Sequence, residues 1–277
     1  MRKFYLRNGN GAMYSFMSTT HWFNEPKGLG LNMGDKYSQV GLNFVRTKKL
    51  SKPKDIEGTL VFTGNDQYSN YYSFAMFAQV EPLTFIYNPN GTEYMVDVHL
   101  KELGKGEINP DTGWLEADIS FKKLSPWYRV VRQRNDGQTV GKVYDYQYPY
   151  KYGKDVANNV TMISDTALES PCKITIIGTC INPIWRLYVN GVLKSTGRVI
   201  TTLTQGQRIV IDTTVIPYSI KKYDNQNNLI TDLYQYSDFS TERFFFLERG
   251  TNRISIGHDG VNTLELAVEA HLEYETV

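Results

Sequence analysis

Short runs in which apolar and polar residues alternate make up most of this 277-residue chain. A period of two is typical of half-buried antiparallel strands, and the Gly, Asn, Asp and Pro residues between the runs supply turn chemistry. The final run is the clearest, with Leu264, Leu266, Val268, Ala270, Leu272 and Tyr274 on one face. The expected strands lie within 58–64, 83–91, 93–103, 113–124, 183–194, 207–215, 243–257 and 264–274. The pattern therefore predicts a mainly β protein.

One segment, residues 66–82, departs from this period and predicts an amphipathic helix. Its apolar stripe comprises Tyr68, Tyr71, Tyr72, Phe74, Ala75 and Ala78. Asn65 or Asp66 can cap its start, and Pro82 disfavours helical geometry at the residue before it. Phe77 falls among the polar residues, with Met76 on its flank. Either a second layer of the same domain covers these two side chains, or they contact another subunit.

A polar, glycine-containing stretch at 132–142 separates two β-rich halves. Such stretches commonly join domains, so we expect one domain over 1–135 and a second over 136–277.

Just after this linker, five tyrosines alternate with other residues over 144–152. In an extended strand their rings would share one face about 27 Å long. Either the row packs under another element or it forms a binding face for sugar rings, although the intervening Asp145, Gln147 and Lys151 would point away from such a face. Because Pro149 cannot donate to a ladder, the row is expected at a strand end or an edge, packed against protein.

Charge and targeting signals add little. The 30 basic and 29 acidic residues nearly cancel, which gives no indication of nucleic-acid binding. No run approaches the roughly 18 apolar residues of a membrane span, and the amino terminus lacks the apolar core of a signal peptide. We therefore expect a soluble protein made in the cytoplasm, without membrane insertion.

The residues that could carry chemistry do not form a convincing site. Gly28, Gly30 and Gly34 lack the spacing of a dinucleotide-binding loop and are expected in turns. Cys172 and Cys180 lie within 171–180, which reads as a single strand; about 26 Å would then separate them, so we expect two buried thiols and no disulfide. His271 shares a strand face with Glu269 and Glu273, which suits a solvated polar face better than a metal site. We expect no catalytic residues, metal or cofactor.

Several stretches, in order, resemble the distal tail proteins of long-tailed phages, chiefly those that infect Gram-positive bacteria. The similar stretches are EPKGLGLN (25–32), DQYSNYYSFAMFAQ (66–79) with LTFIYNP (83–89), ISFKKLSPWYR (119–129), YQYPYKYG (146–153), ESPCKITIIGTCINPIWRLYVNG (169–191) and FFFLERGTNRISI (244–256). Each alone is only a β pattern with Gly or Pro, and their order and spacing carry the resemblance.

This resemblance implies an amino-terminal domain of β-sheets plus one helix, which forms a hexameric ring, and a carboxyl-terminal galectin-like or carbohydrate-binding-module-like β-sandwich. It also implies a non-enzymatic role at the tail tip or baseplate of the virion, after assembly in the host cytoplasm. The implied partners are further copies of the chain, the major tail protein, the tail-tip or tail-fibre protein and, in some members, a receptor-binding protein. A closed ring would place Met76 and Phe77 at or near a subunit interface.

The alternative is a free-standing carbohydrate-binding β-sandwich protein. The galectin sugar-binding pattern, His-x-Asn-x-Arg with a Trp in Trp-Gly-x-Glu, is absent from the second half of the sequence. Trp185 is the only tryptophan there, and we expect it to pack in the core or at a turn. The galectin-like label therefore does not transfer a glycan site to this chain.

Overall fold

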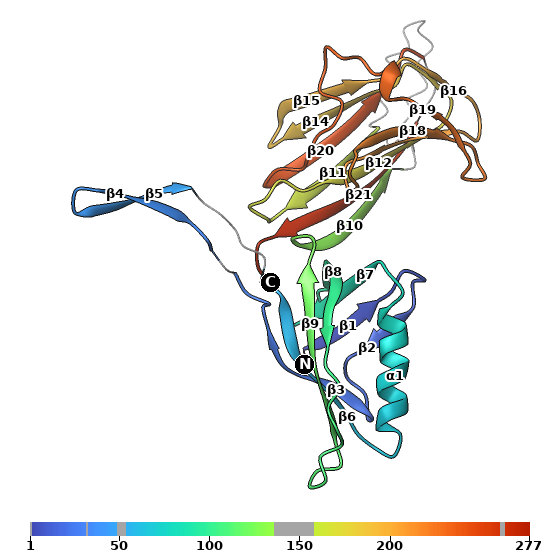
Figure 1. Cartoon of the computed structure of the whole chain (residues 1–277). Helices are drawn as coiled ribbons and strands as arrows, with labels where there is room; N and C mark the ends of the chain where they lie inside the picture. Colours follow the sequence, from blue (N-terminus) through green and yellow to red (C-terminus); the bar gives the residue numbers. More distant parts are fainter. Residues whose placement is uncertain (1, 32, 49–53, 136–157, 261–263) are drawn as a thin grey trace, which may run out of the picture. The chain divides into compact units, whose positions relative to one another are not determined.

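The computed structural model describes residues 2–31, 33–48, 54–135, 158–260 and 264–277. These residues form a mainly β protein with one α-helix, as the sequence predicts (Figure 1). The chain divides into two compact units, one comprising Met1–Arg129 with Tyr274–Val277, and the other Val130–Glu273. The predicted domain boundary after residue 135 stays a prediction, because 136–157 lie outside the described residues.

The strands of the first unit form a closed circuit of antiparallel pairs. The order is β1–β2–β3–β6–β9–β8–β7 and back to β1. Strands β2 and β3 are joined by the isolated bridge between Met17 and Trp22 and by a hydrogen bond that the Phe23 amide donates to the Phe16 carbonyl. A closed circuit leaves few unpaired strand edges. The strands are β1 (Lys3–Arg7), β2 (Met13–Ser15), β3 (His21–Lys27), β6 (Ile56–Phe62), β7 (Leu83–Asn88), β8 (Tyr94–Leu103) and β9 (Leu115–Lys123).

Phenylalanine rings fill the inside of this circuit. Phe16 lies 5.3 Å from Phe23 and 5.7 Å from Phe85, measured between ring centroids, and none of the three is more than 6 % exposed. Trp127 extends the cluster at 6.3 Å from Phe85. Rings at these distances and tilts add attraction beyond the apolar area they bury, which gives the first unit a rigid aromatic core.

The helix α1 (Gln67–Ala78) packs on the same core, since its buried residues Gln67, Tyr71, Phe74 and Ala78 recur at helical spacing. Two parts of the helix prediction are wrong in detail. Tyr72, expected in the apolar stripe, is 58 % exposed. Asp66 occupies the N-cap position, but its side chain makes no capping hydrogen bond.

A separate hairpin leaves the first unit between β3 and β6 (Figure 1). It consists of β4 (Lys36–Val40) and β5 (Asn43–Lys48), which pair only with each other. Gly41 turns the chain with a positive φ of 64°, a conformation that suits glycine. Every residue of both strands is exposed. Alternation along the sequence did not predict this hairpin.

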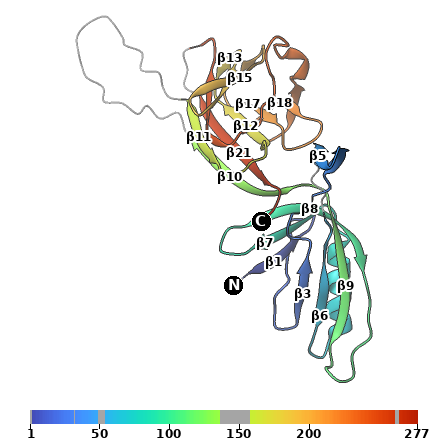
Figure 2. The ribbon, with the colours of Figure 1, turned by 90° about the vertical axis from the view of Figure 1, so that its left-hand side faces the viewer.

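The second unit is a sandwich of two antiparallel sheets (Figure 2). One sheet has the order β10–β21–β12–β17–β18–β19 and the other β11–β20–β14–β15, with a small β13–β16 pair beside them. Strand β10 (Trp127–Asn135) begins in the first unit and ends in the second. The other strands are β11 (Asn159–Ser164), β12 (Cys172–Ile177), β13 (Cys180–Ile181), β14 (Ile184–Val189), β15 (Val192–Arg198), β16 (Thr202–Leu203), β17 (Arg208–Asp212), β18 (Ser219–Tyr223), β19 (Leu229–Asp232), β20 (Gly250–Gly257) and β21 (Glu265–Tyr274).

Alternating burial along both sheets builds the sandwich core. In β21, the predicted inward set from Leu266 to Leu272 is at most 1 % exposed, and Trp185 of β14 is fully buried in the core, one of the two places expected for it. Two predicted strands are wrong in extent. The run 171–180 is interrupted at Gly178, whose φ of 119° turns the chain between β12 and β13. Of 243–257, only Gly250–Gly257 is a strand.

Candidate interaction surfaces

The polar residues considered as chemical sites do not assemble into one. Within the described residues, no group of three or more His, Cys, Asp and Glu side chains is arranged to hold a metal ion. His271 Nε2 lies 3.5 Å from Glu269 Oε1, but Glu269 also accepts a 2.6 Å hydrogen bond from Arg132 Nε. The Arg132 guanidinium holds the pKa of the Glu269 carboxyl below its usual range, against the opposing effect of burial. This strand face is a network of opposite charges.

Gly28, considered for a nucleotide-binding loop, has a packing role. Its φ is 79°, and a Cβ atom at this position would lie 1.9 Å from the carbonyl oxygen of Asp55. A side chain therefore cannot be accommodated without displacing the backbone. Gly30 has no such neighbour within 4 Å.

Three lysines and one aspartate form a charged cluster close to Gly28. Asp55 accepts from Lys101 Nζ at 2.9 Å and lies 3.3 Å from Lys122 Nζ, and the hydrogen bond from Lys101 lowers the pKa of its carboxyl. Lys123 points the other way, into the unit, where its Nζ lies 5.1 Å from the centre of the Trp127 ring. Burial lowers the pKa of the Lys123 ammonium to about 8.

The two cysteines are free and buried, as predicted. Burial raises the pKa of the Cys172 thiol to about 12 and that of Cys180 to about 11. Thiols with such pKa values carry almost no thiolate near neutral pH, so neither is suited to nucleophilic chemistry.

The hairpin β4–β5 is the most exposed apolar surface of the first unit. Leu42 at its tip is 95 % exposed and Phe44 is 72 % exposed. Pairing of Gln39 with Phe44 and of Tyr37 with Arg46 places Tyr37 and Phe44 on one face, while Val40 and Val45 occupy the other. A two-stranded hairpin alone is marginally stable in water, and one with apolar groups on both faces is expected to be covered by another chain.

The structure separates the two residues predicted at a subunit interface. Met76 is 65 % exposed on the outer side of α1. Phe77 is half-buried against the core of its own unit, with its ring 5.6 Å from that of Tyr14. The helical wheel placed Phe77 among polar residues, but Tyr14 lies beneath that side of the helix. Phe77 therefore has an intrachain partner, and the interface assignment of both residues stays a prediction.

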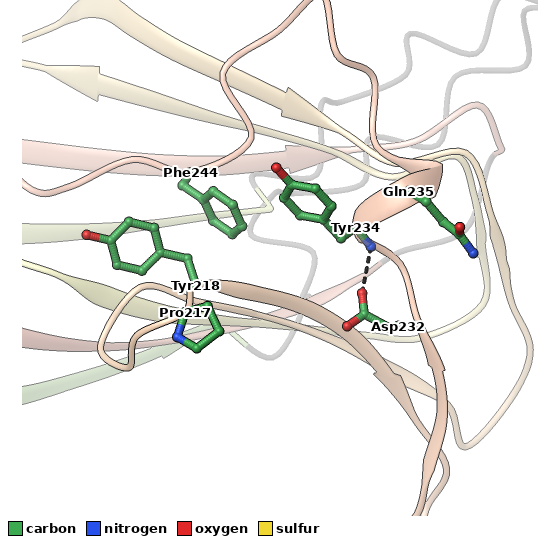
Figure 3. A pocket seen from close by; sticks show the side chains of 6 residues that line it. All are labelled: Pro217, Tyr218, Asp232, Tyr234, Gln235 and Phe244. Atoms are coloured by element: carbon green, nitrogen blue, oxygen red, sulfur yellow. Dashed lines mark hydrogen bonds between the residues drawn. The ribbon is translucent and has the colours of Figure 1, made fainter.

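An aromatic hollow of about 640 Å³ lies at one end of the second unit. Figure 3 shows the rings of Tyr218, Phe244 and Tyr234 side by side, with Asp232 beside Tyr234. Tyr218 precedes β18, Asp232 ends β19, and Tyr234 begins the short 3₁₀-helix η1 (Tyr234–Tyr236). These residues are spread over 217–244 without a common motif, so the sequence pattern did not predict the hollow. The tyrosine row of 144–152 lies outside the described residues.

Residues 3–124 match the family described as "Distal tail protein, N-terminal domain". Over its full length, the chain is similar in fold to a chain of the phage P2 baseplate in its activated conformation with Ca, with a TM-score of 0.68, 17 % identity and 100 % of both chains covered. The Dit protein of phage SPP1 is also similar, with a TM-score of 0.62, 8 % identity and coverage of 96 % of this chain and 98 % of that one. No curated protein sequence matches this chain. Within the described part, no helix has the length and apolar character required to cross a membrane.

The closed β-circuit with its single helix and the sandwich that follows thus have the fold of the solved phage baseplate chains. More specifically, residues 3–124 match the amino-terminal domain of distal tail proteins, which confirms the resemblance found in the sequence.

Proposed function

We propose that this chain forms a homo-hexameric ring at the distal end of the phage tail, which joins the tail tube to the tail-tip or tail-fibre protein. The solved SPP1 relative is described as a hub adsorption apparatus in phages that infect Gram-positive bacteria, which supports a hub role here. The tube side would contact the major tail protein, and the second unit would provide the docking surface for a receptor-binding protein.

The observation that carries this proposal is the β4–β5 hairpin. A closed ring of identical subunits uses two different patches on each subunit, one given to each neighbour. The hairpin would supply one such patch, because Leu42 and Phe44 are largely exposed. Arg46 Nη1 bonds to Asp35 Oδ2 at 3.1 Å, which anchors the base of the hairpin. Burial of its apolar groups against a neighbour would contribute about 1.5 to 3 kcal/mol for each large side chain.

The test is the oligomeric state of the full chain, by multi-angle light scattering and negative-stain microscopy. We expect a six-fold ring for the wild type and loss of the ring in the double variant Leu42→Ser, Phe44→Ser. Ile163→Ser in the second unit is the matched control, because Ile163 is also 72 % exposed but lies outside the hairpin. A wild type that stays monomeric at high concentration would contradict the proposal, and a ring that survives the hairpin substitutions would show that a patch other than the hairpin holds it together.

The match of residues 3–124 to the distal tail protein family favours this role over the free-standing carbohydrate-binding protein. Glycan binding by a chain that remains a monomer would support that alternative.

A further inference from the structure

We propose that the aromatic hollow of the second unit binds a neutral sugar ring. The hollow is lined by Pro217, Tyr218, Asp232, Tyr234, Gln235 and Phe244. Its volume of about 640 Å³ lies within the range of small-molecule sites, which are mostly apolar with a few polar groups that orient the ligand. The C–H face of a pyranose packs on aromatic rings, while its hydroxyl groups need hydrogen-bond partners at the rim.

The aromatic walls are held in place before any ligand arrives. The Phe244 ring lies 5.5 Å from Tyr218 and 6.3 Å from Tyr234, and it is nearly parallel to the latter, with 20° between the planes. The Arg243 guanidinium supports the aromatic rings, because it lies 5.1 Å from the centre of the Tyr234 ring and 4.4 Å from the centre of the Phe239 ring. Tyr218 and Tyr234 nevertheless remain 40 % and 43 % exposed. Fixed and exposed rings can bind a flat apolar face with little loss of side-chain entropy.

Polar groups stand beside these rings and are available to a ligand. Asp232 Oδ1 accepts a 2.9 Å hydrogen bond from the backbone N–H of Tyr234, which orients the carboxylate (Figure 3). Among the described residues, Asp232 Oδ2, the Gln235 amide and the hydroxyls of Tyr218 and Tyr234 have no hydrogen-bond partner. A carboxylate fixed in this way can accept two sugar hydroxyls, the pairing that gives polar ligands their orientation.

The charge of the lining selects the class of sugar. Asp232 is the only charged residue among the six, and the Arg243 guanidinium packs on the Tyr234 and Phe239 rings without lining the hollow, so the lining offers no cation to pair with an anionic ligand such as a uronic acid or a phosphate. A quaternary ammonium ligand would be attracted to the carboxylate, but aromatic sites bind such ligands with rings that converge on one point. Tyr234 and Phe244 are nearly parallel instead, and the hollow is wider than one such group fills. A neutral hexose, deoxyhexose or N-acetylhexosamine fits both the charge and the shape.

Saturation-transfer NMR on the full chain tests this inference with the methyl glycosides of glucose, galactose, rhamnose and N-acetylglucosamine as probes. Glucuronate and tetramethylammonium serve as the charged comparisons. We expect at least one neutral sugar to bind in the millimolar range, since a single sugar ring in a shallow site gains little free energy. Binding only of glucuronate or tetramethylammonium would overturn the inference, and so would no binding of any probe.

Three variants locate the site. Tyr234→Ala and Asp232→Ala are expected to weaken sugar binding about tenfold or more, because they remove a ring face and a fixed acceptor. Tyr236→Ala is the matched control, since Tyr236 lies in the same short helix, is 47 % exposed and does not line the hollow. Asp232→Asn retains an oxygen for the Tyr234 amide and tests the charge if Asp232→Ala fails to fold. Unchanged binding in folded Tyr234→Ala and Asp232→Ala proteins would place the sugar elsewhere and overturn the inference. Light scattering on the same samples reports ring formation separately.

Discussion

In the amino-terminal unit, Lys123 Nζ donates a 2.6 Å hydrogen bond to the backbone carbonyl of Gly28. This contact joins the end of β9 to the chain just after β3 and places an ammonium group in a largely buried position, beside the ring of Trp127. Burial of the charged form costs free energy, which the single carbonyl contact and the nearby Asp55 offset only in part.

Stability should therefore depend on pH through Lys123. Its pKa is lowered from 10.5 to about 8 in the folded protein, so the unfolded chain binds more protons between these values. Through Lys123 alone, stability then rises as pH increases through this window, whereas the raised pKa values of Cys172 and Cys180 make it fall over the same range. We expect Lys123 to contribute a gain of about 1 kcal/mol between roughly pH 7.5 and 9.5, taken as the difference between wild type and Lys123→Met, in which the effect of the two thiols cancels. Urea unfolding followed by tryptophan fluorescence measures it.

Lys123→Met should lose this contribution, so that its stability falls more steeply with pH than that of wild type, while Lys122→Met should follow wild type because Lys122 is half-exposed on the opposite strand face. Burial raises the pKa values of Tyr14 and Tyr128 in the folded state, so these tyrosines would also make stability depend on pH. Their effect lies outside the measured pH range, because that range ends below the pH at which unfolded tyrosines ionise. The same pH dependence in wild type and in Lys123→Met would show that Lys123 makes no such contribution.

The other partner of this contact, Gly28, should tolerate no side chain. Gly28→Ala would place a methyl group 1.9 Å from the Asp55 carbonyl oxygen, at a positive φ. We expect a loss of more than about 2 kcal/mol in the free energy of unfolding. Gly30→Ala is the control, because it lies two residues away with open space around it, and it should change stability by less than about 0.5 kcal/mol. Equal effects of the two substitutions would mean that the turn can relax.

The strands and the helix could be predicted because their signal is local. The period of two in β21 and the helical spacing of Tyr71, Phe74 and Ala78 both record which side of one element meets the core. Whether Phe77 meets its own domain or another subunit could not be predicted, because its partner Tyr14 comes from a distant strand and no helical wheel contains that information. The break at Gly178 was missed because the apolar residues on both sides read as one run.

The interaction surfaces were harder to predict than the fold. Hairpin β4–β5 is exposed on both faces, so it has no inward stripe, although the apolar residues around Gly41 carry a weak signal. The aromatic hollow brings together residues 218, 232, 234 and 244, whose approach depends on the pairing of β18 with β19 and on the segment that precedes β20. Only the tertiary structure shows such a site.

The two thiols should be inert in the folded protein. With pKa values of about 12 and 11, Cys172 and Cys180 would hold a thiolate fraction below about one in a hundred at pH 8. Each is 1 % exposed, so a reagent also has no path to the sulfur. A disulfide-exchange reagent should label neither thiol in buffer and both rapidly in strong denaturant, with the count read by intact mass. Rapid labelling of one thiol in buffer would reveal local opening near that strand.

Met76 and Phe77, the two residues predicted at a ring interface, differ in burial, and this difference allows their roles to be tested separately. Phe77→Asp should lower the free energy of unfolding by about 2 to 4 kcal/mol, because it places a charge beside the Tyr14 ring. Met76→Asp should leave monomer stability within about 0.5 kcal/mol, since Met76 is 65 % exposed. Only Met76→Asp therefore reports on assembly without a folding defect.

If the outer side of α1 contacts a neighbour, Met76→Asp should dissociate the oligomer while the melting temperature of the monomer stays the same. Ser73→Asp supplies the control, because Ser73 is also exposed on this helix and the added charge is identical. Light scattering at matched concentrations distinguishes the two variants. An oligomer that remains intact in Met76→Asp would show that this part of the helix faces solvent in the ring, and assembly would then depend on surfaces such as the β4–β5 hairpin.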